Sequence, residues 1–203
     1  MQTSRLEAFS DGVLAIIITI MVLELHVPEH HSFAALWHET GLSLLTYLLS
    51  FVYVGIYWNN HHHMFQLTKH VNGRVLWANL HLLFWLSLYP FTTAWMDESH
   101  LARVPLTVYG MNLLGAAIAY YLLQTLVLRV EGPDCALRKA LGRDLKGKLS
   151  PVFYTGGILA ALASGEDARW ATATAVALFV FVAIIWVIPD SRIERAIATA
   201  QAG

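Results

Sequence analysis

Six stretches of mostly apolar residues recur along the chain, separated by short polar segments. A helix that spans a lipid bilayer needs about 20 consecutive and predominantly apolar residues. Segments of this kind run over residues 6–26, 41–62, 75–95, 105–128, 151–164 and 170–188. The pattern predicts an all-α integral membrane protein in which residues 1–203 form a single domain of six transmembrane helices.

Prolines mark several of the predicted helix ends. Pro105 and Pro151 suit helix starts, because proline lacks the amide that a first turn leaves unpaired. Pro28 follows the end of the first segment, where a helix commonly stops. Pro90 falls inside the third segment, so we expect that helix to kink there or to end early.

The composition supports a membrane protein. Hydrophobic residues make up 57% of the chain and charged residues only 13%, and the mean hydropathy is +0.53. Soluble domains usually carry about 25% charged residues. Cys135 is the single cysteine, so the chain holds no internal disulfide.

The distribution of lysine and arginine predicts the orientation in the membrane. If the N-terminus is cytoplasmic, all of the 13 basic residues except Arg103 and Arg169 fall in cytoplasmic segments of the six-helix layout. Cytoplasmic loops of membrane proteins carry an excess of Lys and Arg. We therefore expect both termini to lie in the cytoplasm.

One stripe of the first apolar segment combines a charge, an aromatic ring and several aliphatic side chains. At about 100° per residue, the stripe lies within about 60° of Ile16. Its members are Arg5, Phe9, Ile16, Thr19, Ile20 and Leu23. Such a stripe is typical of helix packing or lipid contact as well as of a pore. The uncharged stretch from Gly12 to Leu23 is short, which favours a helix that is wet at both ends.

Around the helix axis, Asp11 lies about 140° from Ile16, so it faces away from this stripe. Arg5 is six residues away and does not share a face with Asp11, so the two do not pair within the helix. A carboxylate at membrane depth is costly without partners. The cytoplasmic end of the second segment offers donors, which predicts a polar network between the first two helices. The donors are Trp58, Asn60, His61 and His62.

The histidines do not predict a metal site. His61, His62 and His63 are consecutive, so on a helix they point in three directions, whereas zinc ligands are spaced by four residues or come from separate elements. Hydrogen bonding or proton exchange is the favoured role of these rings. We expect no metal and no other cofactor. No nucleophile motif or catalytic carboxylate pair stands at membrane depth, so no catalytic residue and no enzyme activity is predicted.

One short stretch looks like a potassium-channel filter but does not qualify as one. Thr107-Val108-Tyr109-Gly110 is similar to the potassium-channel filter, whose rings of carbonyl oxygens replace the hydration shell of the ion. One glycine is missing, no re-entrant loop is evident, and the stretch opens the fourth apolar segment. We reject it as a filter.

The motifs together resemble a known family. Arg5-x-x-x-Phe9-Ser10-Asp11, the Ile-rich helix after it, and Trp58-x-Asn60-His61-His62-x-x-Phe65 resemble the transmembrane protein 175 family of endolysosomal potassium channels and their prokaryotic relatives. Animal members carry two six-helix repeats, whereas this chain has one Phe-Ser-Asp. The resemblance implies a single-repeat prokaryotic form, a homotetramer in the lipid bilayer of the cell membrane, most simply the prokaryotic inner membrane.

The resemblance also implies roles for individual residues. The first helix would line a central pore, with its narrowest ring at Ile16 and a constriction that continues outward at Ile20 and Leu23. Thr19 would supply a hydroxyl that influences ion preference, and Glu24 would attract cations at the mouth. The implied polar network contains Arg5, Phe9, Ser10, Asp11, Trp58, Asn60, His61 and His62. The implied function is a potassium-permeable cation channel with permeant K⁺ ions, monovalent cations as its partners and no nucleic-acid partner.

Two alternatives stay open. Asp11, His61 and His62 could carry protons near neutral pH, as in a proton-coupled secondary transporter. Such transporters usually show paired repeats or broken helices around a site at the midplane of the membrane, and neither is visible here. A proton-conducting channel that uses the same pore is the other alternative.

Overall fold

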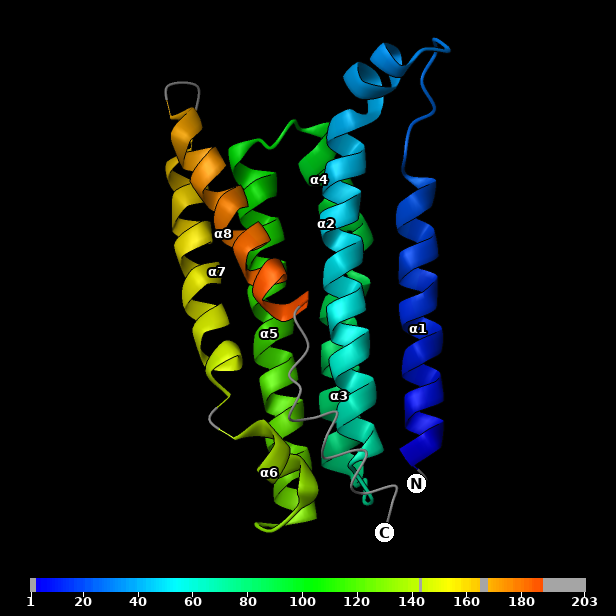
Figure 1. The fold of residues 1–203 in the computed structure, drawn as a ribbon, viewed down its shortest axis with the longest axis vertical. Coiled ribbons are helices and arrows are strands. Elements are labelled where there is room, and N and C mark those ends of the chain that lie inside the picture. The colour runs from blue at the N-terminus through cyan, green and yellow to red at the C-terminus, as the bar shows by residue number, and fades with distance from the viewer. Residues whose placement is uncertain (1–2, 143, 165–167, 188–203) are drawn as a thin grey trace.

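The computed structural model describes residues 3–142, 144–164 and 168–187, and its long helices run side by side along one axis (Figure 1). Every regular element of this described part is an α-helix, which confirms the predicted all-α class. The helices are α1 (Thr3–Leu23), α2 (Phe33–Gln66), α3 (Gly73–Ser87), α4 (Tyr89–Glu98), α5 (Arg103–Glu131), α6 (Ala136–Leu141), α7 (Leu145–Ala163) and α8 (Arg169–Val187).

Four of these helices are long and apolar enough to cross a membrane, namely α1, α2, α5 and α8. The six predicted segments overlap these four helices, the α3–α4 pair and α7, and that all six cross the membrane stays a prediction. The first turn of α7 contains Lys146 and Lys148, which lowers its hydropathy. The predicted single helix over residues 75–95 is wrong in detail, because α3 ends at Ser87 and α4 begins at Tyr89. Pro90 occupies the second position of α4, where its missing amide is tolerated.

Two helices begin earlier than the composition predicts. Helix α2 begins at Phe33 instead of residue 41, because the Ser32 side chain accepts a hydrogen bond from a first-turn amide at 3.1 Å. Helix α7 begins at Leu145 instead of residue 151, because the Asp144 side chain caps it in the same way. Pro151 therefore lies inside α7 and does not start it. Apolar composition marks the part of a helix in the membrane, whereas capping side chains mark its first turn.

The remaining ends differ from the prediction by at most four residues, the largest shift being the end of α2 at Gln66 instead of residue 62. Helix α1 covers residues 3–23 where 6–26 was expected, and α5 covers 103–131 where 105–128 was expected. Helix α8 covers residues 169–187, and residue 188 lies outside the described residues. Frayed ends and charged first turns account for shifts of this size, because they extend a helix beyond its apolar stretch.

Helix α5 lies at the centre of the bundle and packs against α3, α4 and α7, while α8 packs against α7 and α2. Helix α1 packs against α2, α3 and α4 at the edge of the bundle. We call the end of the molecule where α1 begins and α2 ends the lower end, and the opposite end the upper end, as drawn in Figure 1. Close approach of α5 to α3 depends on Gly115, since a Cβ there would lie 2.5 Å from the Trp85 ring.

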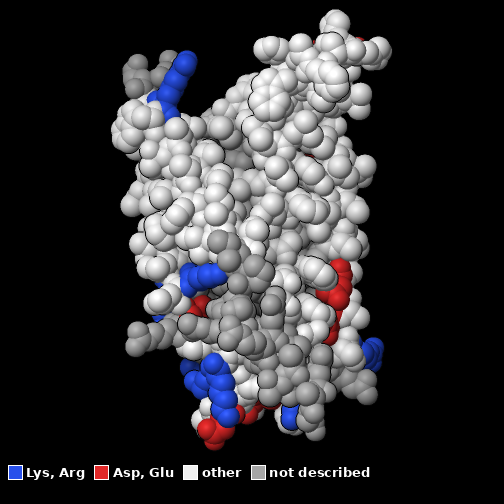
Figure 2. Space-filling view, viewed as in Figure 1, with Lys and Arg blue, Asp and Glu red and all other residues white. Residues whose placement is uncertain are grey.

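Charged side chains are unevenly distributed on the face shown in Figure 2. Lys and Arg gather mainly toward the lower end, where the N-terminus lies, and a broad belt above them is almost uncharged. Arg143, Arg192 and Arg195, which entered the predicted charge bias, lie outside the described residues. The predicted orientation, with both termini in the cytoplasm, stays a prediction.

Candidate functional site on the first helix

Helix α1 has one face packed on its own subunit and one face uncovered. The packed face repeats every three or four residues and consists of Leu6, Ser10, Leu14, Ile17 and Met21. On the opposite face, the exposed fraction is 58% for Ile16 and 80% for Leu23. All six residues of the predicted stripe lie on this exposed face, namely Arg5, Phe9, Ile16, Thr19, Ile20 and Leu23.

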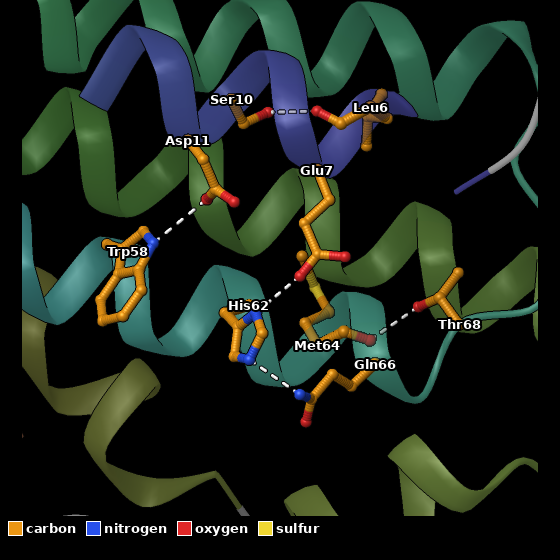
Figure 3. Close-up of polar contacts among 9 residues, drawn as sticks. All are labelled: Leu6, Glu7, Ser10, Asp11, Trp58, His62, Met64, Gln66 and Thr68. Carbon is orange, nitrogen blue, oxygen red and sulfur yellow. Dashed lines mark hydrogen bonds and ion pairs between the residues drawn. The ribbon is translucent and has the colours of Figure 1, made fainter. Parts of the chain in front are cut away.

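Two polar contacts join the side of α1 to α2 (Figure 3). The indole Nε1 of Trp58 donates a hydrogen bond to Oδ1 of Asp11 at 3.1 Å. Nδ1 of His62 lies 2.6 Å from Oε1 of Glu7. The Gln66 amide nitrogen donates to Nε2 of His62 at 2.7 Å. Since Nε2 accepts, the ring proton sits on Nδ1 and is donated to the carboxylate.

The spacing of these residues explains why the contacts form together. Glu7 and Asp11 are four residues apart on α1, and Trp58 and His62 are four residues apart on α2, so each pair lies on one face. The two helices run in opposite directions, and the pairs therefore meet in register (Figure 3). The Trp58 and His62 rings also stack, with an angle of 15° between their planes. Glu7 was missed at the sequence level, and this matched spacing is the signal that could have found it.

A second arm of the network is fully buried and centres on Asn79 of α3. Its amide nitrogen donates to Oγ of Ser10 at 3.0 Å, and its Oδ1 lies 2.8 Å from Nε2 of His61. Ser10 in turn donates to the Leu6 carbonyl at 2.9 Å. Asn79 thereby connects α1, α2 and α3, with all three polar side chains at most 1% exposed. Asn79 carries no motif around it, and sequence reasoning did not identify it.

Three predicted members of the network do not take part in it. The Asn60 side-chain amide donates to the Ile56 carbonyl of its own helix at 2.7 Å, and the backbone carbonyl of Asn60 accepts from the Tyr120 hydroxyl at 3.2 Å. Arg5 is exposed and makes no hydrogen bond or ion pair within the described residues. Phe9 is 55% exposed on the uncovered face of α1. Only Trp58 of the proposed donors contacts Asp11.

Glu24 lies one residue beyond the end of α1. It is exposed, and it lines a small crevice between α1, α2 and α4. The crevice also contains Asp97 and the hydroxyl-bearing residues Ser43 and Thr93. The predicted mouth acid thus borders a crevice within its own subunit.

The remaining motifs lie within the packed helices. His61 and His62 both make hydrogen bonds, and among the described residues no group of three or more His, Cys, Asp or Glu side chains is gathered to hold a metal. The filter-like stretch 107–110 is part of helix α5. Tyr109 within it is completely buried, and Gly110 packs against Phe179. This stretch therefore offers no ring of free carbonyls.

Comparison with known proteins places these features in a family. The sequence profile described as "Endosomal/lysosomal potassium channel TMEM175" matches residues 5–90, which cover nearly all of α1, all of α2 and α3, and both arms of the network. A protein from Chryseobacterium sp. (strain P1-3) named a potassium channel is 50% identical over 197 residues, which cover 97% of this chain and 98% of the relative. A crystal structure described as a lysosomal potassium-selective channel TMEM175 homolog from Chamaesiphon minutus superposes with a TM-score of 0.68, at 28% identity. The superposition covers 91% of this chain and 97% of the homolog.

Animal proteins match only in part. The protein from Gallus gallus named an endosomal/lysosomal proton channel TMEM175 is 35% identical over 111 residues, which cover 47% of this chain and 22% of the relative. The bacterial relative, in contrast, matches along nearly its entire length. Profile, full-length relative and fold agree, and the chain therefore belongs to the TMEM175 family of membrane channels.

Proposed function

We propose that this chain forms a potassium-permeable cation channel in the cell membrane, in which α1 from each of four identical subunits lines a central pore. The bacterial relatives that carry the name potassium channel support the permeant ion. The observation that carries the proposal is the uncovered stripe on α1, which combines large aliphatic groups with Arg5 and Thr19. Charged side chains within membrane segments usually face a bundle interior or a water-filled cavity, which favours a face around a water-filled axis.

The gate in this proposal is a ring of Ile16 side chains, continued outward by Ile20 and Leu23. A narrow ring of aliphatic groups empties of water and stops ions without a charged barrier. Thr19 lies next to this ring, and its hydroxyl proton is directed to the Ile16 carbonyl at 2.9 Å. The lone pairs of the hydroxyl oxygen then remain available to a partly dehydrated cation. Four such oxygens would favour one ion size modestly, since they do not form a complete coordination shell.

The polar contacts of α1 would keep this stripe aimed at the axis. Trp58 with Asp11 and His62 with Glu7 hold one side of the helix, and Asn79 holds Ser10 on the packed face. Consecutive residues differ by about 100° around the helix axis, so a rotation of α1 by less than this would turn Ile16 away from the pore axis. In this proposal the channel gates when α1 rotates or tilts against these contacts.

Replacing Ile16 by asparagine tests the proposal. A polar ring stays hydrated, so the Ile16→Asn variant should raise K⁺ flux in proteoliposomes above that of the unmodified protein. Leu48→Asn is the matched control, because Leu48 is 55% exposed, close to the 58% of Ile16, but lies on α2. It should leave the flux unchanged. Equal fluxes for Ile16→Asn and the unmodified protein would contradict the gate, and equal increases in both variants would indicate a leak from general distortion.

Proton movement is the second candidate function. Relatives from several animals are named proton channels, and His62 donates to a carboxylate at the lower end of α1. A proton-coupled transporter would show saturable flux and exchange of one ion against the other, whereas a channel would show neither. Flux of K⁺ measured with and without an imposed pH gradient distinguishes these cases.

A further inference from the structure

A small cavity lies between α2, α5 and α7 in the lower half of the molecule (Figure 1), and none of the residues that line it belongs to α1. Its volume is about 40 Å³, which has room for about three water molecules. Aromatic rings form much of its wall, namely Tyr53, Tyr57, Tyr120, Tyr121, Tyr154 and Trp186. Asp144 is the one charged residue among the described residues of the lining.

The polar groups of this lining offer hydrogen-bond acceptors, because their donors are already used. The side-chain amide nitrogen of Asn60 donates to a carbonyl of its own helix, and that of Gln124 donates to Oδ2 of Asp144 at 3.2 Å. The indole Nε1 of Trp186 donates to Oγ of Ser150 at 2.8 Å. The side-chain oxygens of Asn60 and Gln124 accept no hydrogen bond from the described residues. A ligand that supplies several N–H groups would therefore suit this cavity.

The Tyr57 hydroxyl points independently to a missing partner. Tyr57 is only 7% exposed, and its ring packs edge-on against the Tyr120 ring with centroids 6.0 Å apart. The Tyr120 hydroxyl donates to the backbone carbonyl of Asn60 at 3.2 Å, whereas the Tyr57 hydroxyl makes no hydrogen bond within the described residues. A buried hydroxyl without a partner is costly. The cavity thus calls for a polar occupant.

Asp144 keeps free acceptor positions although it caps α7. Its Oδ1 accepts from the Gly147 amide at 3.1 Å, and its Oδ2 accepts from Gln124. An ionised carboxylate has about four lone-pair positions, so about two remain. Aromatic faces attract organic cations as well. An alkali-metal ion needs a shell of oxygen atoms in place of its water, which aromatic walls do not provide. The lining therefore favours an ammonium group over a metal ion.

Two features place the cavity at the level of lipid head groups. Tyr121 is 54% exposed, so part of the cavity wall belongs to the outer surface of the bundle. Lys148 is exposed in the first turn of α7, and its backbone amide donates to the Asp144 carbonyl at 3.2 Å. Tyrosine and lysine side chains concentrate where membrane helices meet the head groups. A zwitterionic head, with an ammonium and a phosphate, matches the opposite charges of Asp144 and Lys148.

We propose that this cavity binds a primary ammonium group, with Asp144 as its counter-ion. The three N–H groups donate to the Asp144 carboxylate and to acceptors among Asn60, Gln124 and Tyr57, and tyrosine rings surround the adjoining carbon atoms. A lipid with an ethanolamine head and a free alkylamine both carry this group. A trimethylammonium group has no N–H donor and is too large for a volume of about 40 Å³. The site goes beyond the proposed function and does not depend on where α1 lies relative to other subunits.

Thermal unfolding of the detergent-purified protein, titrated with ethylammonium chloride, tests the site. A ligand of three non-hydrogen atoms binds no tighter than about 1 mM. The titration therefore extends to about 0.1 M, with KCl added to keep the ionic strength constant. Ethylammonium should raise the unfolding midpoint, and tetramethylammonium at the same concentration should not. Equal shifts with both cations, or no shift with either, would contradict the site.

Removal of the Asp144 charge should weaken ethylammonium binding at least about tenfold, because the ligand loses its charged partner. Asp144→Asn is suited to this test, because asparagine caps helices and tolerates the positive φ of 42° found here. Glu131→Gln is the matched control. Glu131 is also a carboxylate at the lower end, where it accepts the amides of Lys69 and His70, but it does not line the cavity. Its variant should retain the affinity.

Substitutions in the wall give a second line of evidence, which also serves if Asp144→Asn fails to fold. Tyr57→Phe keeps the ring and removes the hydroxyl without a partner, so the affinity should fall several-fold. Tyr121→Leu should lower the affinity about two- to fivefold, whereas Tyr121→Phe, which keeps an aromatic face, should retain it. Unchanged affinity in Asp144→Asn, or in both Tyr57→Phe and Tyr121→Leu, would overturn the proposal and leave only water in the cavity.

Native mass spectrometry of the protein with added lipid separates the two sources of the ammonium group. Phosphatidylethanolamine is compared with phosphatidylcholine of the same acyl chains, which differs by three methyl groups on nitrogen. A lipid head in the cavity predicts preferential binding of phosphatidylethanolamine that Asp144→Asn abolishes and Lys148→Gln weakens. Lys148→Gln should leave ethylammonium binding unchanged. Ethylammonium binding without preference for phosphatidylethanolamine would instead assign the site to a free amine.

Discussion

Replacing Asn79 by leucine measures how strongly the buried arm of the network holds α1. The Asn79 amide bridges Ser10 on α1 and His61 on α2 through contacts of 3.0 and 2.8 Å. Leucine has a similar branched shape but is larger than asparagine, so the substitution also carries a packing cost, which the control Asn112→Leu shares. Relative to that control, the variant loses mainly two hydrogen bonds between helices.

The expected loss follows from the partners left behind. Double-mutant cycles assign about 0.6 kcal/mol to such a bond inside a membrane protein, with a maximum of about 1.7 kcal/mol. Ser10 keeps its bond to the Leu6 carbonyl, whereas His61 keeps none within the described residues, because its Nδ1 is already without a partner. Two bonds give a decrease of about 1–3 kcal/mol in the free energy of unfolding, most of it from His61.

Unfolding of the purified protein in mixed detergent–SDS micelles would measure this decrease. Asn112→Leu is the matched control, because Asn112 is 2% exposed, close to the 1% of Asn79, but makes one long bond, 3.3 Å to Oγ1 of Thr92, and leaves its Oδ1 without a partner. It should cost less than Asn79→Leu. A cycle with His61→Leu should give a coupling energy near 0.6–1.7 kcal/mol. Additive effects, or a larger loss for Asn112→Leu, would refute the bridging role of Asn79.

Two further predictions address selectivity and packing. Thr19→Val should reduce discrimination of K⁺ over Na⁺, because the ring loses its oxygens while its width is kept; reversal potentials under bi-ionic conditions that do not move would contradict this. Gly115→Ala should lower the free energy of unfolding by about 1–3 kcal/mol, since the added methyl group meets a tryptophan ring at 2.5 Å. Gly55→Ala, with open space around it, should instead raise stability by up to about 1 kcal/mol. The unfolding assay described for Asn79 compares the two, and equal effects would be inconsistent with the close approach of α5 to α3.

Much of the site on α1 was accessible from residue spacing. Helical spacing predicted that Ile16, Ile20 and Leu23 share one face of the helix and that Asp11 lies on another. In the structure these three side chains lie on the exposed face of α1, and Asp11 lies on a different face. The partner of Asp11 came from a short list of donors on the second helix, of which Trp58 is the one in contact. Spacing within a helix is enough for such statements, because the angle between residues is set by helix geometry alone.

The buried arm of the network could not be predicted from residue spacing. Asn79 lies in α3, far from both motifs in sequence, and an asparagine in an apolar segment does not show which helices it joins. The opposite error was made for Asn60, which was predicted to join the network because it stands between two network residues. Its side chain instead donates to a carbonyl of its own helix. Local bonds of asparagine to backbone carbonyls compete with contacts between helices, and only the packed structure decides between them.

The amino-acid sequence by itself determined the helical class, the number of apolar segments, the two faces of α1 and the family. These depend on hydrophobic periodicity and on short motifs, which are local properties of the chain. Tertiary structure decided where the capping residues Ser32 and Asp144 extend helices, that Asn79 joins three of them, and that Ser50 brings hydroxyls of α4 and α5 together. Such contacts depend on the rotation and depth of each helix against its neighbours, which no single segment specifies.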